Sequence, residues 1–513
     1  TTGGNNVAVG SNALEANTTA SNNTAIGNAA LLVNTTGSHN VAVGANALDT
    51  NTTGSYNTAV GSLALTANTN GANNVAMGYA TLDANIGGSE NTALGQAALG
   101  GNTTASYNTA VGAGALQSNT THEGNTAVGR NALNVNDASN NTAVGRSALT
   151  DLTGGNNNNA IGENCLGDVT TGSSNNAMGT DAGRELTTAQ YCVYIGAAAG
   201  RFATTADNNV AVGHNSLTTN TTGAGNTALG RESMRLNTTG GANVAVGNEA
   251  LEENTEGSNN IAIGVHAMGA NTTGTGNTAI GRGALDVNTT GGENVAIGYE
   301  TLDANTTANN NTALGNGALG NNTTGTDNTA VGMGAAQDST EGDSLVAVGR
   351  LALENNTTGN RSVAVGYQAL ASNTTGDNNV AIGKDALQSN TTANYNTAVG
   401  YEALEMNSTG TANVAVGPFA LDENTTASNN VAVGYGALSA NTIGSENTAL
   451  GGNALQNTTT ADNNTGVGYR ALENNTTGSN NVAVGFEACQ ATSTGTHNIG
   501  IGFRAFEVNT TGS

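Results

Sequence analysis

Short apolar runs alternate with longer polar stretches along the whole chain, at a spacing that hardly varies. A glycine preceded by an aliphatic residue recurs from Gly10 to Gly502 in 30 copies, with 28 intervals of 17 residues and one of 16. A typical copy reads N-[TV]-A-[VI]-G-x-x-A-L-x-x-N-T-T-G-x-x, and we number its positions from this recurring glycine as zero. A fixed period of this length indicates a solenoid, in which each repeat packs on its neighbours.

The segment N-[TV]-A-[VI]-G alternates in period two and is bounded by turn formers, which predicts a short strand. The segment N-T-T-G-x-x predicts a turn, because Asn and Gly tolerate positive φ and Thr bonds locally. A helix is disfavoured by this density of Gly and Asn. We therefore predict an all-β fold: a parallel β-solenoid (β-roll) of about 30 coils, forming one uncapped array over residues 1–513, with stacked Asn and Thr side chains satisfying the turns.

Position −2 holds alanine in 27 of the 30 copies. If the aliphatic side chains at −1 and −3 point into the coil, the alanine points outward, because successive strand side chains alternate between faces. A position kept small then indicates close packing, either against a neighbouring subunit or against another wall of the same coil. We favour the subunit, with Ala245, Ala262 and Ala279 as representative contacts.

The repeat becomes irregular from about residue 152 to 205. Four successive coils have an apolar residue in place of Asn at +7, and glycine replaces Leu at +4 in two of them. One interpretation is a coil variant that repacks a corner with apolar residues; the other is a kink or docking site. The candidate residues of such a site are Arg184, Tyr191, Tyr194, Arg201 and Phe202.

Two further ladders of equivalent positions are candidates for surface chemistry. The Asn-Thr-Thr triplet at +7 to +9 fits the glycan-acceptor pattern, with Asn17, Asn34, Asn237 and Asn373 as examples. It also fits a purely structural turn, or a hydroxyl array that orders water as in ice-binding solenoids. Position +1 carries aromatic residues mixed with arginine. Both residue types are favoured in contact surfaces, but the pattern also fits ordinary variation of exposed residues. The candidate contacts there are Tyr367, Tyr401, Tyr435 and Tyr469.

Composition narrows the function. The formal charge is −25, with 12 basic and 37 acidic residues, which disfavours nucleic acid as a partner. No apolar run is long enough to insert into a membrane. The three cysteines occupy different coils and positions, so a disulfide framework is not expected. We find no catalytic, metal-binding or cofactor-binding constellation and expect no enzyme, metal site or cofactor. Both ends fall within a turn, so we expect a slice of a longer array.

The repeat resembles the head of YadA-like trimeric autotransporter adhesins, through segments such as Asn40–Gly44 and Asn379–Gly383. That resemblance implies a parallel β-roll with three chains around one axis. The longer segment Asn396–Leu404 is similar to repeats of phage tail-fibre-type proteins. We therefore expect an extracellular structural protein, either a cell-surface filament, an adhesin shaft or a virion fibre, that associates with itself as a homotrimer or end to end and contacts host or environmental surfaces. The alternative is an ice-binding or glycan-binding solenoid that uses the Asn-Thr-Thr ladder.

Overall fold

The computed structural model describes residues 2–507 and 510–512. Over these residues the chain forms a parallel β-solenoid of about 29 turns, each of about 17 residues, and no segment is helical. The predicted fold class is confirmed. The outermost parts of the predicted array, at residues 1, 508–509 and 513, lie outside the described residues.

The chain divides into two compact units, residues 1–257 and 258–513. Nearly every coil contributes one three-residue strand, which covers positions −3 to −1. The strands of the first unit are β1 (Val7–Val9), β2 (Thr24–Ile26), β3 (Val41–Val43), β4 (Thr58–Val60), β5 (Val75–Met77), β6 (Thr92–Leu94), β7 (Thr109–Val111), β8 (Thr126–Val128), β9 (Val135–Asn136), β10 (Thr142–Val144), β11 (Asp151–Leu152), β12 (Asn159–Ile161), β13 (Asn176–Met178), β14 (Val193–Ile195), β15 (Val210–Val212), β16 (Thr227–Leu229) and β17 (Val244–Val246). Those of the second unit are β18 (Ile261–Ile263), β19 (Thr278–Ile280), β20 (Val295–Ile297), β21 (Thr312–Leu314), β22 (Thr329–Val331), β23 (Val346–Val348), β24 (Val363–Val365), β25 (Val380–Ile382), β26 (Thr397–Val399), β27 (Val414–Val416), β28 (Val431–Val433), β29 (Thr448–Leu450), β30 (Thr465–Val467), β31 (Val482–Val484) and β32 (Ile499–Ile501).

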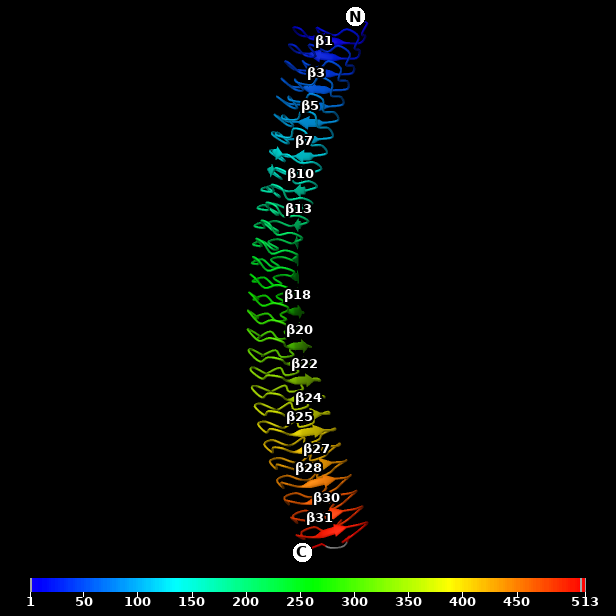
Figure 1. The fold of residues 1–513 in the computed structure, drawn as a ribbon, viewed down its shortest axis with the longest axis vertical. Coiled ribbons are helices and arrows are strands. Elements are labelled where there is room, and N and C mark those ends of the chain that lie inside the picture. Colours follow the sequence, from blue (N-terminus) through cyan, green and yellow to red (C-terminus); the bar gives the residue numbers. More distant parts are fainter. Residues whose placement is uncertain (1, 508–509, 513) are drawn as a thin grey trace. The chain divides into compact units, whose positions relative to one another are not determined.

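Within each unit, successive strands stack one on the next (Figure 1) and pair in parallel. Each residue lies beside its equivalent in the next coil, as Ala42 lies beside Ala59. The one short interval preserves this register: Thr126 of β8 pairs with Thr142 of β10. Near the same place β9 and β11 form a separate two-stranded sheet. Side chains at the same repeat position therefore form a column along each unit.

The glycine at position zero is required by both backbone conformation and space. All 30 of these glycines have φ between 127° and 143°, a range that other residues rarely adopt. A methyl group on Gly400 would lie 2.6 Å from the carbonyl oxygen of Gly417 in the next coil. Positive φ also occurs at +2, +4 and −5, for example at Asn46, Leu48 and Tyr56, and not at the Asn and Gly of the N-T-T-G turn where we expected it.

The alanine column at −2 points into the coil, so the predicted orientation of the strand is wrong. Ala245, Ala262 and Ala279 are fully buried within their own chain, while the residues at −3 and −1 are half-buried or exposed. Gly466 shows what fills the space: a methyl group there would lie 3.1 Å from the Ala471 carbonyl oxygen and 3.2 Å from Leu455 Cγ. The opposite wall of the coil, built from positions +3 and +4, therefore keeps −2 small, and these alanines are not available as subunit contacts.

Two columns of buried asparagine close most of the coils. Asn40 at −4 and Asn51 at +7 both donate from Nδ2 to the Gly54 carbonyl oxygen, at 2.8 and 3.0 Å. Their Oδ1 atoms accept from the next coil: from the Asn57 backbone N–H at 2.9 Å and from Asn68 Nδ2 at 2.8 Å. Because buried polar groups are costly unless hydrogen-bonded, these bonds account for the asparagine at both positions.

Candidate interaction surfaces

The outward side chains at −3 and −1 of each unit form what we call the strand face. Position −1 is Val, Ile, Leu or Met in all 30 copies, and position −3 is Val, Ile, Thr or Asn. These side chains are half-buried or exposed; Met178 is 51% exposed and Ile263 38%. Thus a flat row of parallel strands presents apolar side chains to its surroundings over every coil of each unit.

The strand face contains no charged residue at any of its 60 positions, although the chain has 49 charged residues. Charges instead occupy turns and corners; Arg231 at +1, for example, pairs with Glu232 and Glu249. Contiguous exposed apolar surfaces larger than a few hundred Å² mark interaction sites in soluble proteins. Sequence reasoning placed −3 and −1 inside the coil and so missed this face, because position −2 is equally free of charge and only its small size distinguishes it.

The predicted aromatic contacts at +1 are exposed at the edge that follows the glycine. Tyr367, Tyr401, Tyr435 and Tyr469 are 38–59% exposed. Cationic and aromatic neighbours surround them: the Lys384 ammonium lies 5.0 Å from the ring centre of Tyr401, and Phe419 contacts both Tyr401 and Tyr435 edge to face. The structure thus places these four residues in one column of the second unit.

The Asn-Thr-Thr ladder is largely structural. Asn34, Asn237 and Asn373 are fully buried, and each Nδ2 donates two hydrogen bonds, which leaves no room for a glycan on the folded coil. Asn17 is half-buried and makes the same bond to the +10 carbonyl. The interpretation of these residues as glycan acceptors is therefore wrong for the three buried residues, and the structural interpretation of the asparagine ladder is confirmed.

The threonine at +8 belongs to the same structural ladder. Its hydroxyl donates to the +8 carbonyl of the next coil, as Thr52 Oγ1 does to Thr69 O at 3.0 Å. The threonine at +9 is exposed, as Thr53 is, whereas the one at +8 is half-buried in most coils, as Thr52 is. The adjacent hydroxyls therefore do not form a free, regular array.

The irregular coils repack the interior around Tyr194. This residue stands at −2, where other coils have Ala, and it is fully buried. Methyl groups on Gly183 and Gly200, which stand where other coils have Leu, would lie 2.8 Å from Tyr194 Cδ2 and 2.5 Å from Tyr194 Cδ1. The phenol ring therefore occupies space that two leucines fill elsewhere. Its hydroxyl has no hydrogen-bond partner, and burial raises the pKa of Tyr194 well above its usual value.

The other candidate residues of the irregular coils do not converge on one site. Arg184 and Arg201 each approach Asp181 at 3.9 Å, and the Arg201 guanidinium lies over the Phe202 ring at 5.1 Å. Tyr191 is 62% exposed at position −5 and makes no aromatic contact with them. The arrangement fits the variant-coil interpretation.

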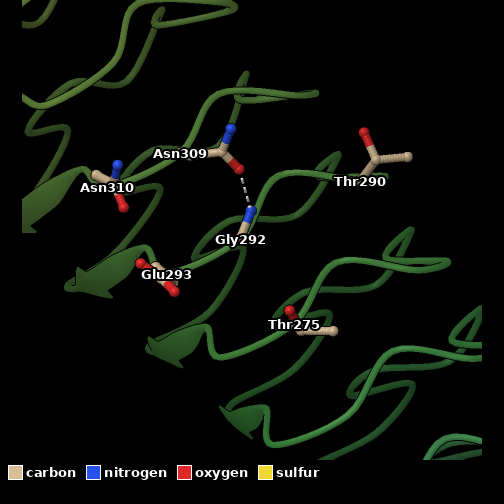
Figure 2. Close-up of a pocket in the computed structure, with 6 residues that line it drawn as sticks. All are labelled: Thr275, Thr290, Gly292, Glu293, Asn309 and Asn310. Atoms are coloured by element: carbon tan, nitrogen blue, oxygen red, sulfur yellow. Dashed lines mark hydrogen bonds between the residues drawn. The ribbon is translucent and has the colours of Figure 1, made fainter.

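A shallow polar hollow lies at the corner formed by positions +9, +11 and +12 of the second unit (Figure 2). The Gly292 N–H donates to Asn309 Oδ1 at 2.7 Å, and backbone hydrogen bonds join Glu293 to Thr275 and Asn310 to Gly292. An equivalent hollow occurs farther along, where the Ser445 N–H donates to Asp462 Oδ1 at 2.7 Å. The hollow is therefore a recurring feature of the coil corner. The residues that line the hollow in Figure 2 are Thr275, Thr290, Gly292, Glu293, Asn309 and Asn310.

The cysteines do not contribute to these surfaces. Cys165, Cys192 and Cys489 are buried free thiols. Cys192 takes the place of Asn at −4, and its thiol lies 3.2 Å from the Ala206 carbonyl oxygen that the asparagine would contact. Within residues 2–507 and 510–512, no three His, Cys, Asp or Glu side chains are placed to hold a metal ion.

The described part of the chain also has no helix of the length and apolar character that crossing a membrane requires. Comparison with protein-family models and with curated proteins gave no match to the chain. The resemblance to adhesin heads and tail fibres therefore stays a prediction.

Proposed function

We propose that this chain is a structural fibrous protein whose copies associate side by side through the strand face, as the shaft of an extracellular filament, adhesin or virion fibre. The observation that carries the proposal is the uncharged, exposed strand face, continuous over every coil of each unit. Ala at −2 has no part in this contact, because it fills the interior.

The size of the strand face fits a partner of protein dimensions. Each unit has fifteen strands in its main sheet. With a spacing of about 4.8 Å between strands and about 10 Å for three residues, the face of one unit covers about 700 Å². A standard protein interface buries about 800 Å² on each partner. One unit therefore offers nearly the area that a stable association needs.

Charge and repeat length favour a second copy of the chain as that partner. With a net charge of −25, two copies repel each other over most of their surface, and the strand face is where this repulsion is weakest. Two copies also share the same coil spacing, so their rows of Val, Ile and Thr side chains interdigitate in the same register along each unit. Raising the salt concentration screens the repulsion and should strengthen the association.

Three substitutions on the strand face test the proposal. Val346→Lys, Val363→Lys and Val380→Lys place charges at −3 in three successive coils of the second unit. The matched control carries the same charges on exposed +9 threonines: Thr324→Lys, Thr358→Lys and Thr375→Lys. Sedimentation velocity should show oligomers for the unsubstituted chain and the control, and monomers for the strand-face variant. A monomeric unsubstituted chain, or an oligomeric strand-face variant, refutes the proposal.

A further inference from the structure

The aromatic column of the second unit has a stricter spacing than the repeat requires. Tyr367, Tyr401, Tyr435, Tyr469 and Phe503 all stand at +1 and follow one another at intervals of 34 residues, which is every second coil. A further aromatic residue, Phe486, stands at +1 in the coil between Tyr469 and Phe503. All five rings are exposed, from 38% at Tyr367 to 73% at Phe503. We call these five residues the aromatic column.

Neighbouring side chains hold the rings of the column. The Arg350 guanidinium lies 5.8 Å from the ring centre of Tyr367, and the Arg470 guanidinium lies 5.1 Å from that of Tyr469. Phe486 stacks between Tyr469 and Phe503, with ring centres 5.6 and 5.4 Å away. Contacts of this kind reduce the entropy lost when a ligand binds, because the rings are already ordered.

We propose that the aromatic column binds an extended, neutral β-1,4-linked polysaccharide that lies along the solenoid. Two coil rises are about 10 Å, which is also the length of one disaccharide unit in such a chain. Successive sugars of a β-1,4-linked chain are turned over relative to each other, so the same sugar face recurs at every second sugar. Aromatic side chains pack against the C–H faces of sugars, and at this spacing each ring meets an equivalent face.

Polar side chains beside the column supply partners for the sugar hydroxyls. Gln368, Asp385 and Glu402 stand at +2, directly after the aromatic or cationic residue at +1, and none is fully exposed. Gln368 and Glu402 are half-buried and remain accessible, whereas Asp385 is buried and pairs with Lys384. Carboxylate and amide oxygens at the edge of an aromatic surface accept hydrogen bonds from hydroxyl groups, which fixes a sugar above the rings.

Charge favours a neutral polysaccharide over an acidic one. The chain as a whole is strongly acidic, and two of the cations near the column already have carboxylate partners. Lys384 pairs with Asp385, and the guanidinium of Arg470 lies 3.3 Å from Glu473. The column also lies beyond the glycine at position zero, off the strand face, so this inference does not rest on the self-association proposed above.

Binding of the whole 513-residue chain to insoluble cellulose and insoluble chitin tests the proposal, with a β-1,3-glucan and the acidic polysaccharide alginate as comparison ligands. We expect binding to cellulose, chitin or both, and weak or no binding to the comparison ligands. Replacing Tyr367, Tyr401, Tyr435 and Tyr469 with alanine should weaken binding at least about tenfold. The control replaces Tyr56, Tyr107, Tyr191 and Tyr395, which are 60–65% exposed at −5, and should bind as the unsubstituted chain does.

A variant that keeps the number of aromatic rings tests the spacing itself. Tyr435→Ala with Gly452→Tyr moves one ring by a single coil, and a Cβ atom at Gly452 would make only ordinary contacts, the nearest with the Tyr469 ring at 3.4 Å. We expect this variant to bind more weakly than the unsubstituted chain while its association state is unchanged. Equal binding by the shifted variant, equal loss in the −5 control, equal binding to the β-1,3-glucan, or no binding to either β-1,4-linked ligand overturns the proposal.

Discussion

Tyr194 provides a test of how the irregular coils are packed. Its ring takes the space of two leucines, so Tyr194→Ala should leave a cavity between Gly183 and Gly200. Replacing a large buried aromatic residue with alanine typically costs about 3–5 kcal/mol. We expect a loss in this range, confined to the neighbouring coils because each coil contacts mainly its neighbours.

A second pair of substitutions should destabilise the coils when Tyr194 is present and stabilise them when it is replaced by alanine. Gly183→Leu and Gly200→Leu restore the usual residue at +4, and both glycines already have the left-handed conformation of Leu166 and Leu217 at that position. With Tyr194 in place the two leucines clash with the ring and should destabilise the coils by about 1–3 kcal/mol or more. Together with Tyr194→Ala they should rebuild a regular coil and recover most of the loss.

Hydrogen exchange measured on the amides of β13, β14 and β15 reports local stability in each variant. The reasoning is refuted if the two leucines destabilise the Tyr194→Ala variant as much as they destabilise the unsubstituted chain. Tyr194→Phe separates the ring from its hydroxyl. Because that hydroxyl is buried without a partner, its removal should leave stability unchanged or raise it.

Three further predictions concern single positions. Gly400→Ala should destabilise its coils strongly, by about 3 kcal/mol or more, because of positive φ and the contact with Gly417. Gly452→Ala at +1 should be mild, since a methyl group there meets nothing nearer than 3.4 Å; hydrogen exchange distinguishes the two variants. Burial, followed by nearby carboxylates, raises the pKa of Asp422 to about 6, so its coils should become more stable as the pH is lowered from 7 to about 5. Asp422→Asn should remove that dependence, as followed by urea denaturation at each pH. The three buried thiols should resist alkylation at pH 8 in the native chain and react in urea, as counted by mass spectrometry; burial raises the pKa of Cys165 to about 12.

The sequence was sufficient for the architecture because each coil repeats the same information. The period of the glycine, the strand at −3 to −1 and the structural role of Asn at +7 all follow from the pattern, and the structure confirms them. The direction of the strand did not follow, because alternation in period two shows that −2 opposes −3 and −1 but not which side faces inward. None of the three columns carries charge, so the usual signal for the outer face was missing.

Residue size is the feature of the sequence that shows which face of the strand points into the coil. The interior between the strand and the opposite wall is narrow, so it accepts Ala at −2 together with Ala and Leu at +3 and +4. The irregular coils have the same narrow interior, but there one large residue at −2 is compensated by two small residues at +4. Tyr194 enters the interior only because Gly183 and Gly200 are small, and these residues are far enough apart in sequence that composition alone does not connect them.

Comparison of the 30 copies also separates the positions whose residue type is explained by packing within one chain from those that it does not explain. Single-chain packing accounts for the glycine at zero, the asparagines at −4 and +7, and the small or apolar residues at −2, +3 and +4. It does not account for −3 and −1, whose side chains point out of the coil. An outward strand position in an isolated solenoid would accept Lys or Glu in some of the copies, since charged side chains on exposed strands oppose unwanted pairing. Charge is absent from both positions in every copy, which supports the proposal that a second surface covers the strand face.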